Sequence, residues 1–129
     1  MEKTKVEMEY DLKNSALSTI WLSIGTPAGM ADWFADDIKV DGKRYIFTWD
    51  KHEEVALLVR MRSLAYICFQ WESDEVENPE CYFELSIAVN ELTGDTILHV
   101  VDFAVEDEVE ETRLWWNMQI DKMMRIYGF

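Results

Sequence analysis

Between residues 106 and 127, apolar positions recur every three or four residues, which is the spacing of one face of an α-helix. This stripe comprises Val109, Thr112, Trp116, Ile120, Met123 and Tyr127. Acidic residues crowd the first turns, Lys122 and Arg125 lie in the last turns, and Gly128 follows, which suits the helix dipole and a glycine cap. The pattern predicts one long helix whose apolar stripe covers another surface.

The opposite face of this helix is not wholly polar. Leu114 and Met118 lie four residues apart on it, and Trp115 lies on its flank. Isolated apolar side chains are common on protein surfaces, which gives one interpretation of this group. The other interpretation is a contact surface for a partner protein.

Near the start of the chain, an alternating pattern is followed by two helical ones. In residues 5–12 apolar and charged side chains alternate, which predicts a half-buried strand. Residues 16–23 have helical spacing and lead to Gly25. Thr26-Pro27 is a typical start for a second short helix, because a capping hydroxyl precedes a proline. We therefore expect a strand and then two short helices.

From residue 36 the apolar positions recur with a period of two, which is typical of β-strands. Asp41-Gly42 is a pair that tight hairpin turns favour, since both central residues can require positive φ. Residues 72–80 are acidic, contain Pro79 and lack periodicity, so we expect the longest and most mobile loop there. The predicted strands are 38–40, 43–49, 53–61, 64–71, 81–89 and 96–103.

The order of elements is thus one strand, two short helices, six strands and a long helix. An antiparallel sheet of about seven strands cannot leave its inner face in water, and the long helix with the small helical hairpin remains to cover it. The sequence therefore predicts an α+β fold in which a curved antiparallel sheet wraps on the C-terminal helix. With 129 residues and 49% apolar side chains, residues 1–129 suit a single domain with one core.

Charge narrows the range of partners. The formal net charge is −14 and no basic patch interrupts it, so binding to nucleic acid or to an anionic membrane is disfavoured. This charge is compatible with a basic protein partner and with a neutral apolar ligand. No apolar run is long enough to cross a bilayer and the first ten residues lack a signal-peptide core, so we expect a cytoplasmic protein without membrane insertion.

Two cysteines, Cys68 and Cys81, lie within predicted strands, as buried free thiols do in reducing compartments. If Ile67, Phe69 and Trp71 point inward, Cys68 points outward, whereas the parity of Cys81 places it on the inner face. The two thiols then lie on opposite faces of the sheet and cannot form a disulfide.

Residues suited to catalysis or metal binding are sparse. His52 and His99 lie far apart, without cysteines or paired carboxylates at ligand spacing, so we expect no metal and no other cofactor. The aspartates between residues 32 and 41 lack the spacing of a calcium loop, and turns or caps explain them. No serine has a histidine and an acid in triad order, and the glycines form no phosphate-binding run. We therefore expect no catalytic residues.

Several aromatic and turn motifs are found along the chain, namely Thr26-Pro27 with Trp33-Phe34, Phe47-Thr48-Trp49, Phe69-Gln70-Trp71, and Asp102-Phe103-Ala104 before the helix that contains Trp116. Together they resemble the helix-grip START-like domains of the SRPBCC superfamily, nearest the branch related to the activator of a heat-shock chaperone ATPase. More closely, the chain resembles small acidic uncharacterised START-like proteins of Bacteroidetes-type bacteria. The resemblance covers essentially the whole chain. It implies a cavity between sheet and terminal helix that can admit an apolar molecule, and no catalytic motif carries over.

With six Trp, six Phe and five Tyr, the chain raises the question of whether aromatic rings fill the core or line this cavity. Core filling is the default, and Trp49, Trp71 and Trp116 are the rings that we expect to reach a cavity. The candidate ligand-binding residues are Trp33, Phe34, Phe47, Trp49, Phe69, Trp71, Phe83, Trp116, Ile120 and Met123.

The resulting hypothesis is a non-enzymatic START-like binding module that holds a small apolar or amphipathic ligand, such as a lipid, between the sheet and the C-terminal helix. The alternative is a protein-interaction or chaperone-regulator-like domain that uses its acidic surface and the group Leu114, Trp115 and Met118. An enzyme of cyclase or hydrolase type is a third hypothesis, which requires polar side chains that converge inside the cavity.

Overall fold

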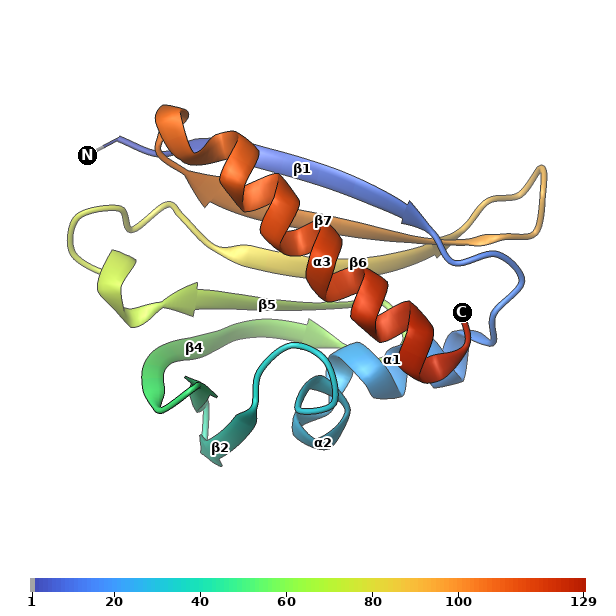
Figure 1. The fold of residues 1–129 in the computed structure, drawn as a ribbon, viewed down its shortest axis with the longest axis horizontal. Coiled ribbons are helices and arrows are strands. Elements are labelled where there is room, and N and C mark those ends of the chain that lie inside the picture. Colours follow the sequence, from blue (N-terminus) through green and yellow to red (C-terminus); the bar gives the residue numbers. More distant parts are fainter. Residues whose placement is uncertain (1) are drawn as a thin grey trace.

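The computed structural model describes residues 2–129, and Figure 1 shows its fold. In chain order the strands and α-helices of these residues are β1 (Thr4–Asp11), α1 (Leu17–Gly25), α2 (Pro27–Met30), β2 (Asp37–Asp41), β3 (Arg44–Trp49), β4 (His52–Arg62), β5 (Tyr66–Trp71), β6 (Phe83–Val89), β7 (Thr96–Ala104) and α3 (Val109–Tyr127). Short 3-10 helices, η1 (Glu72–Asp74) and η2 (Glu106–Glu108), follow β5 and precede α3. The predicted order of one strand, two helices, six strands and a long helix is confirmed.

All seven strands form one antiparallel sheet in the order β1-β7-β6-β5-β4-β3-β2. From β2 to β7 each strand pairs with the next one along the chain, and only β1 pairs out of sequence, with Thr4 opposite Ala104. The long helix α3 crosses one face of the sheet, and α1 and α2 lie near its C-terminal end (Figure 1). This arrangement confirms the α+β helix-grip fold.

The β2–β3 hairpin differs from the prediction by one residue. Asp41 is still paired in the sheet, opposite Arg44, so the turn consists of Gly42 and Lys43. Gly42 has φ of 62°, a left-handed value that glycine adopts without strain. The expected turn pair Asp41-Gly42 is therefore wrong, because the ladder continues through Asp41 and requires positive φ only after it.

Helix α3 begins at Val109, and the acidic residues before it form η2. Trp116, Ile120 and Met123 on the predicted stripe are at most 1% exposed, so this stripe is the covered face of the helix. Gly128 ends the helix with φ of 74°, as a left-handed glycine cap. Within residues 2–129, neither α3 nor any other helix is long and apolar enough to cross a bilayer.

Residues 72–80 are more ordered than an exposed loop. Their first three residues form η1, and Asp74 and Asn78 are buried. The Asp74 carboxylate is paired with the Lys3 ammonium at 2.6 Å. The backbone oxygen of Asp74 accepts a 2.9 Å hydrogen bond from the backbone amide of Asn78. The segment therefore contains a short 3-10 helix that the sequence analysis did not predict, and it is joined to a partner 71 residues away in the sequence.

Both cysteines are buried free thiols, as predicted. Cys68 pairs with Glu84 on the outer face of the sheet, whereas Cys81 precedes β6, which begins at Phe83, and so lies outside the strand predicted for it. Burial raises the pKa of Cys68 to about 11 and also raises the pKa of Cys81. Both groups are therefore neutral near pH 7 and poorly suited as nucleophiles.

Candidate ligand-binding site

Aromatic side chains occupy the space between α3 and the inner face of the sheet. Phe34, which lies between α2 and β2, is at their centre, and its ring centroid is 5.1 to 5.7 Å from the centroids of six other aromatic residues. These neighbours are Trp33, Phe47, Trp49, Phe83, Trp115 and Trp116. Edge-to-face and stacked contacts of this kind have the density of a packed core.

All ten predicted ligand-binding residues belong to this layer or pack against it. Eight of them are at most 1% exposed, namely Trp33, Phe34, Phe47, Phe69, Phe83, Trp116, Ile120 and Met123. The other two, Trp49 and Trp71, are only partly buried. A molecule that arrives from solvent therefore meets these two rings first, and contact with the other eight requires the core to open.

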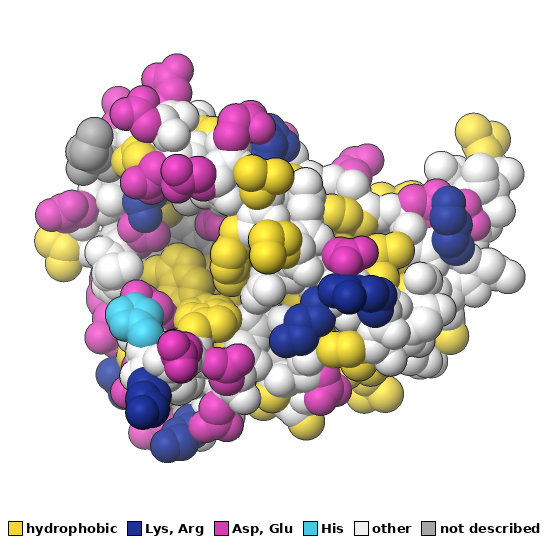
Figure 2. Space-filling model, viewed as in Figure 1, with side chains coloured by type: hydrophobic (Ala, Val, Ile, Leu, Met, Phe, Trp, Pro, Cys, Tyr) yellow, Lys and Arg dark blue, Asp and Glu magenta, His cyan; other side chains and the backbone are white. Residues whose placement is uncertain are grey.

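Trp49 and Trp71 form an open edge of the layer together with Trp115, and we call these three residues the tryptophan mouth. The ring centroid of Trp49 lies 6.2 Å from that of Trp71 and 6.0 Å from that of Trp115. Trp49 is held by a 2.7 Å hydrogen bond from its Nε1 to the carbonyl oxygen of Phe34, and Trp115 is 38% exposed. Figure 2 shows that this face of the molecule is hollowed and that hydrophobic side chains lie in the hollow.

Sequence reasoning assigned Trp115 to the outer group of α3 and so missed its place in the mouth. One step along an α-helix turns the side chain by about 100°, so Trp115 lies at the border of the stripe that contains Trp116. Its ring is long enough to reach Phe34, with a centroid separation of 5.6 Å. The large size of a residue at the border of the buried stripe was the signal that could have found it.

Beside Trp115 the mouth adjoins a depression of about 350 Å³. It is lined by Asp102, Glu108, Glu111, Thr112 and Trp115. Asp102 Oδ2 accepts a 2.8 Å hydrogen bond from Trp116 Nε1, and Oδ1 accepts a 2.7 Å hydrogen bond from the amide of Phe103. Burial raises the pKa of Asp102, although these two hydrogen bonds and the charge of Lys3 act in the opposite direction. The sequence analysis used Asp102 only as a motif residue and did not predict its place in this wall.

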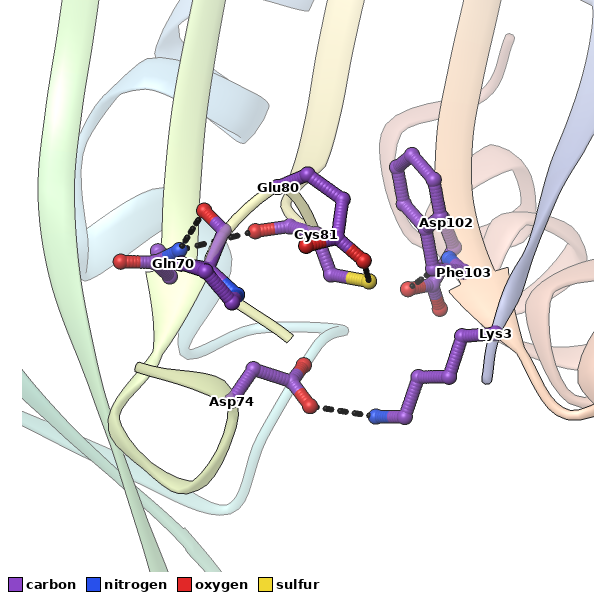
Figure 3. Close-up of polar contacts among 8 residues, drawn as sticks. Lys3, Gln70, Asp74, Glu80, Cys81, Asp102 and Phe103 are labelled. Carbon is purple, nitrogen blue, oxygen red and sulfur yellow. Dashed lines mark hydrogen bonds and ion pairs between the residues drawn. The ribbon is translucent and has the colours of Figure 1, made fainter. Parts of the chain in front are cut away.

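Near Asp102, polar contacts join the segment before β1 to η1, and join β5 to the residues that precede β6 (Figure 3). Lys3 Nζ lies 2.6 Å from Asp74 Oδ1. Gln70 Nε2 donates hydrogen bonds to the carbonyl oxygens of Pro79 and Cys81, at 2.8 and 3.1 Å. These contacts lie near the end of the sheet where β5 and β7 both end.

Within residues 2–129, no three side chains of His, Cys, Asp and Glu are placed to hold a metal ion. His52 Nε2 lies 2.7 Å from Glu54 at an exposed site. His99 Nε2 lies 3.5 Å from Glu7, on the outer face of the sheet. Among the described residues, the mouth holds flat rings and carboxylates, and it holds no paired nucleophile and base.

A depression of about 380 Å³ lies on the outer face of the sheet. It is lined by Glu9, Ser86, Ala88, Val89, Asn90, Ile97 and His99. No Trp, Tyr or Phe lines it, so it offers an apolar ligand little surface on which to stack. We therefore take the tryptophan mouth and its adjoining depression as the candidate site.

A family model described as a START-like superfamily domain matches residues 1–129. Among solved structures, the chain is similar to BfR322 from Bacteroides fragilis, with 38% identity, a TM-score of 0.68 and coverage of 100% of this chain and 94% of that one. The Aha1 dimer from Colwellia psychrerythraea (11% identity, TM-score 0.71, 94% of each chain) and MLL2253 from Mesorhizobium loti (11% identity, TM-score 0.76, 97% of each chain) share the fold. No curated protein matches the chain. The chain belongs to the START-like superfamily.

Proposed function

We propose that this protein is a non-enzymatic binding module that holds a small apolar or amphipathic molecule in the tryptophan mouth, between the sheet and α3. The START-like fold is one that binds hydrophobic ligands, which supports the proposal. The observation that favours this place is the incomplete cover of Trp49, Trp71 and Trp115, beside a layer whose other rings are sealed from water. Apolar surface left open in a hollow is typical of a binding site.

The hollow limits the size of the ligand. The depression beside Trp115 measures about 350 Å³, which is near the lower end of small-molecule sites. Behind the mouth, aromatic rings fill the space between sheet and helix, so a long acyl chain has no room to enter. The geometry therefore favours a ligand of one or two rings over a long-chain lipid.

Covering the exposed indole gives a useful driving force. Trp115 is 38% exposed, which corresponds to about 90 Å² on a side chain of about 250 Å². At about 25 cal/mol per Å², removing this area from water contributes about 2 kcal/mol before the costs of association are subtracted. Trp49 and Trp71 add to this, so affinities in the micromolar range are within reach of a small aromatic molecule.

The substitution Trp115→Ala tests the proposal, because it removes one ring of the mouth and leaves the buried layer in place. Thermal unfolding and intrinsic tryptophan fluorescence are measured while single compounds from a panel of small aromatic and amphipathic molecules are added. We expect compounds of one chemical class to raise the melting temperature of the natural protein and to change its fluorescence. The Trp115→Ala protein should show a weaker response.

Met118→Ala is the matched control, since Met118 lies three residues along the same helix, is 70% exposed and belongs to no part of the mouth. This variant should bind the same compounds as the natural protein. The proposal fails if no compound raises the melting temperature, or if Met118→Ala and Trp115→Ala lose binding to the same extent.

A second candidate function is a protein-interaction or chaperone-regulator-like domain that binds a basic partner through its acidic surface. The observation that favours it is the exposure of Leu114 and Met118 on the outer face of α3, at 62% and 70%. A net charge of −14 suits a basic partner. In this case a complex recovered with the protein would be lost on Leu114→Asp or Met118→Asp, and it would weaken with added salt. Trp115→Ala would then weaken the binding of the partner protein and have no effect on the binding of any small molecule.

A further inference from the structure

The wall of the tryptophan mouth is acidic. Asp102 from β7, Glu108 from η2 and Glu111 from α3 line the depression beside Trp115, and no Lys or Arg lines it. In residues 2–129 neither Glu108 nor Glu111 forms an ion pair. Three carboxylates from three different elements therefore stand beside one exposed indole ring.

The basic side chains of this region do not neutralise the wall. Lys3 is paired with Asp74 at 2.6 Å. Arg113 donates a 2.9 Å hydrogen bond to the carbonyl oxygen of Glu7 and lies 3.9 Å from the carboxylate of Glu110. The positive end of the α3 dipole offsets only about half a charge. The wall therefore keeps a net negative charge at neutral pH.

The rings of the mouth favour a ligand of the opposite charge. The faces of aromatic rings attract a cation within about 6 Å of the ring centroid, and indole does so most strongly. Trp115 lines the depression together with Asp102, Glu108 and Glu111, so a cation in the depression lies beside an indole ring as well as the acidic side chains. The Trp115 ring and the carboxylates can thus act on the same group of a ligand.

We infer that the ligand of the tryptophan mouth is an organic cation, a protonated amine joined to a small apolar or aromatic body. The inference rests on the proposed function and adds the chemical class of the ligand to it. The apolar body covers the indole faces, and the ammonium group donates hydrogen bonds to Asp102 and Glu111. The net charge of −14 attracts cations toward the protein and repels anions of the same shape.

Asp102 has acceptor capacity left for this role. An ionised carboxylate offers about four lone-pair positions. Trp116 Nε1 and the amide of Phe103 use one position on each oxygen. These two donors hold the carboxylate in a fixed orientation, which lowers the cost of ordering it when a ligand binds.

The experiment compares three probes with one ring system and different charges, namely tryptamine, 3-methylindole and indole-3-acetate. Their affinities for the full chain are measured by isothermal titration calorimetry at pH 7. We expect tryptamine to bind at least about fivefold more tightly than 3-methylindole and indole-3-acetate to bind most weakly. Added sodium chloride should weaken the binding of tryptamine and leave that of 3-methylindole unchanged.

Two substitutions test whether the cation binds at the acidic wall of the depression. Glu111→Gln and Asp102→Asn should each weaken tryptamine binding by about threefold to tenfold and leave 3-methylindole binding unchanged. Glu110→Gln is the matched control, because Glu110 is the neighbour of Glu111 and lies outside the depression, and its affinity for tryptamine should not change. Glu111→Gln alone decides the outcome if Asp102→Asn unfolds, since the Glu111 side chain is exposed and makes no ion pair in residues 2–129.

The outcomes separate the inference from the proposed function. If 3-methylindole binds as tightly as tryptamine and Trp115→Ala weakens both, the mouth binds ligands without preference for a cation and the inference is wrong. If Glu110→Gln weakens tryptamine binding as much as Glu111→Gln does, the cation is held elsewhere and the inference is also wrong. If none of the three probes binds, both the inference and the proposed function are overturned.

Discussion

The substitution Phe34→Ala measures how much of the stability of the protein depends on the aromatic layer. Phe34 is fully buried, and its ring contacts six other aromatic residues. The carbonyl oxygen of Phe34 accepts hydrogen bonds from Trp49 Nε1 and Gln119 Nε2, at 2.7 and 2.8 Å. Both bonds involve the backbone and persist in the variant, so the substitution isolates the effect of the ring.

We expect a loss of about 4 kcal/mol in the free energy of unfolding. Replacing a fully buried Phe by Ala costs about 3 to 5 kcal/mol through lost burial and an unfilled cavity, and the rings around Phe34 are too large and too constrained to collapse into the space. A domain of this size has about 5 to 15 kcal/mol of stability, so the variant remains folded with little margin. Its melting temperature should fall by roughly 12 to 20 °C.

The assay is urea unfolding followed by circular dichroism, which does not depend on the fluorescence of the neighbouring indoles. Phe103→Ala is the matched control, because Phe103 lies on the outer face, is partly exposed and has one aromatic neighbour, Tyr82, at 5.1 Å. It should cost about 1 kcal/mol. Equal losses for the two variants would refute the conclusion that the space under α3 is filled by mutually packed rings.

Three further predictions follow from single contacts. Asp102→Asn should change the pH dependence of stability. Burial raises the pKa of Asp102 above 3.8, so ionisation of this carboxyl group costs the folded state free energy. In urea unfolding, the natural protein should therefore lose stability relative to the variant as the pH rises from 3.8 through the raised pKa. Gly29→Ala should destabilise the protein by about 2 kcal/mol or more, because the added methyl carbon would lie 1.9 Å from the carbonyl oxygen of Leu22, and a melting temperature equal to that of the natural protein would contradict this packing. Lys3→Met should cost about 1 to 2 kcal/mol because it leaves Asp74 buried without its partner, and an unchanged urea midpoint would show that the pair contributes nothing.

The fold could be predicted from the sequence because periodicity reports which side of each element is buried. Trp116 and Ile120 lie on the covered face of α3, where the helical spacing places them. Cys68 lies on the face opposite to that of Phe69 because strand parity fixes the direction of each side chain in β5. Such patterns depend only on local geometry, and the order of strands and helices follows them, whereas the β2–β3 turn and η1 do not.

The candidate site was harder to predict, because it depends on how side chains pack together and on contacts between residues far apart in the sequence. Periodicity identified the buried rings and could not say whether they touch, and the structure brings Phe34 into contact with six of them. Asp102 has the same parity as the buried Leu98 and Val100, so its inward direction was readable from the sequence, although its partner Trp116 was not. The burial of Asp74 had no local signal at all, since Lys3 lies 71 residues away.

The pairing of β1 with β7 has a consequence for how the chain folds during synthesis. Asp11 pairs with Ile97 and Thr4 with Ala104, so the residues of β1 meet their partners only after 86 to 100 further residues have been made. The hairpins from β2 to β7 are local and can form earlier, whereas the first strand leaves the ribosome with one side apolar and without its partner. Slow translation should therefore help the middle of the sheet to form and leave the docking of β1 and α3 as late steps. In a refolding experiment, hydrogen exchange should protect the amides of β4 and β5 before those of β1.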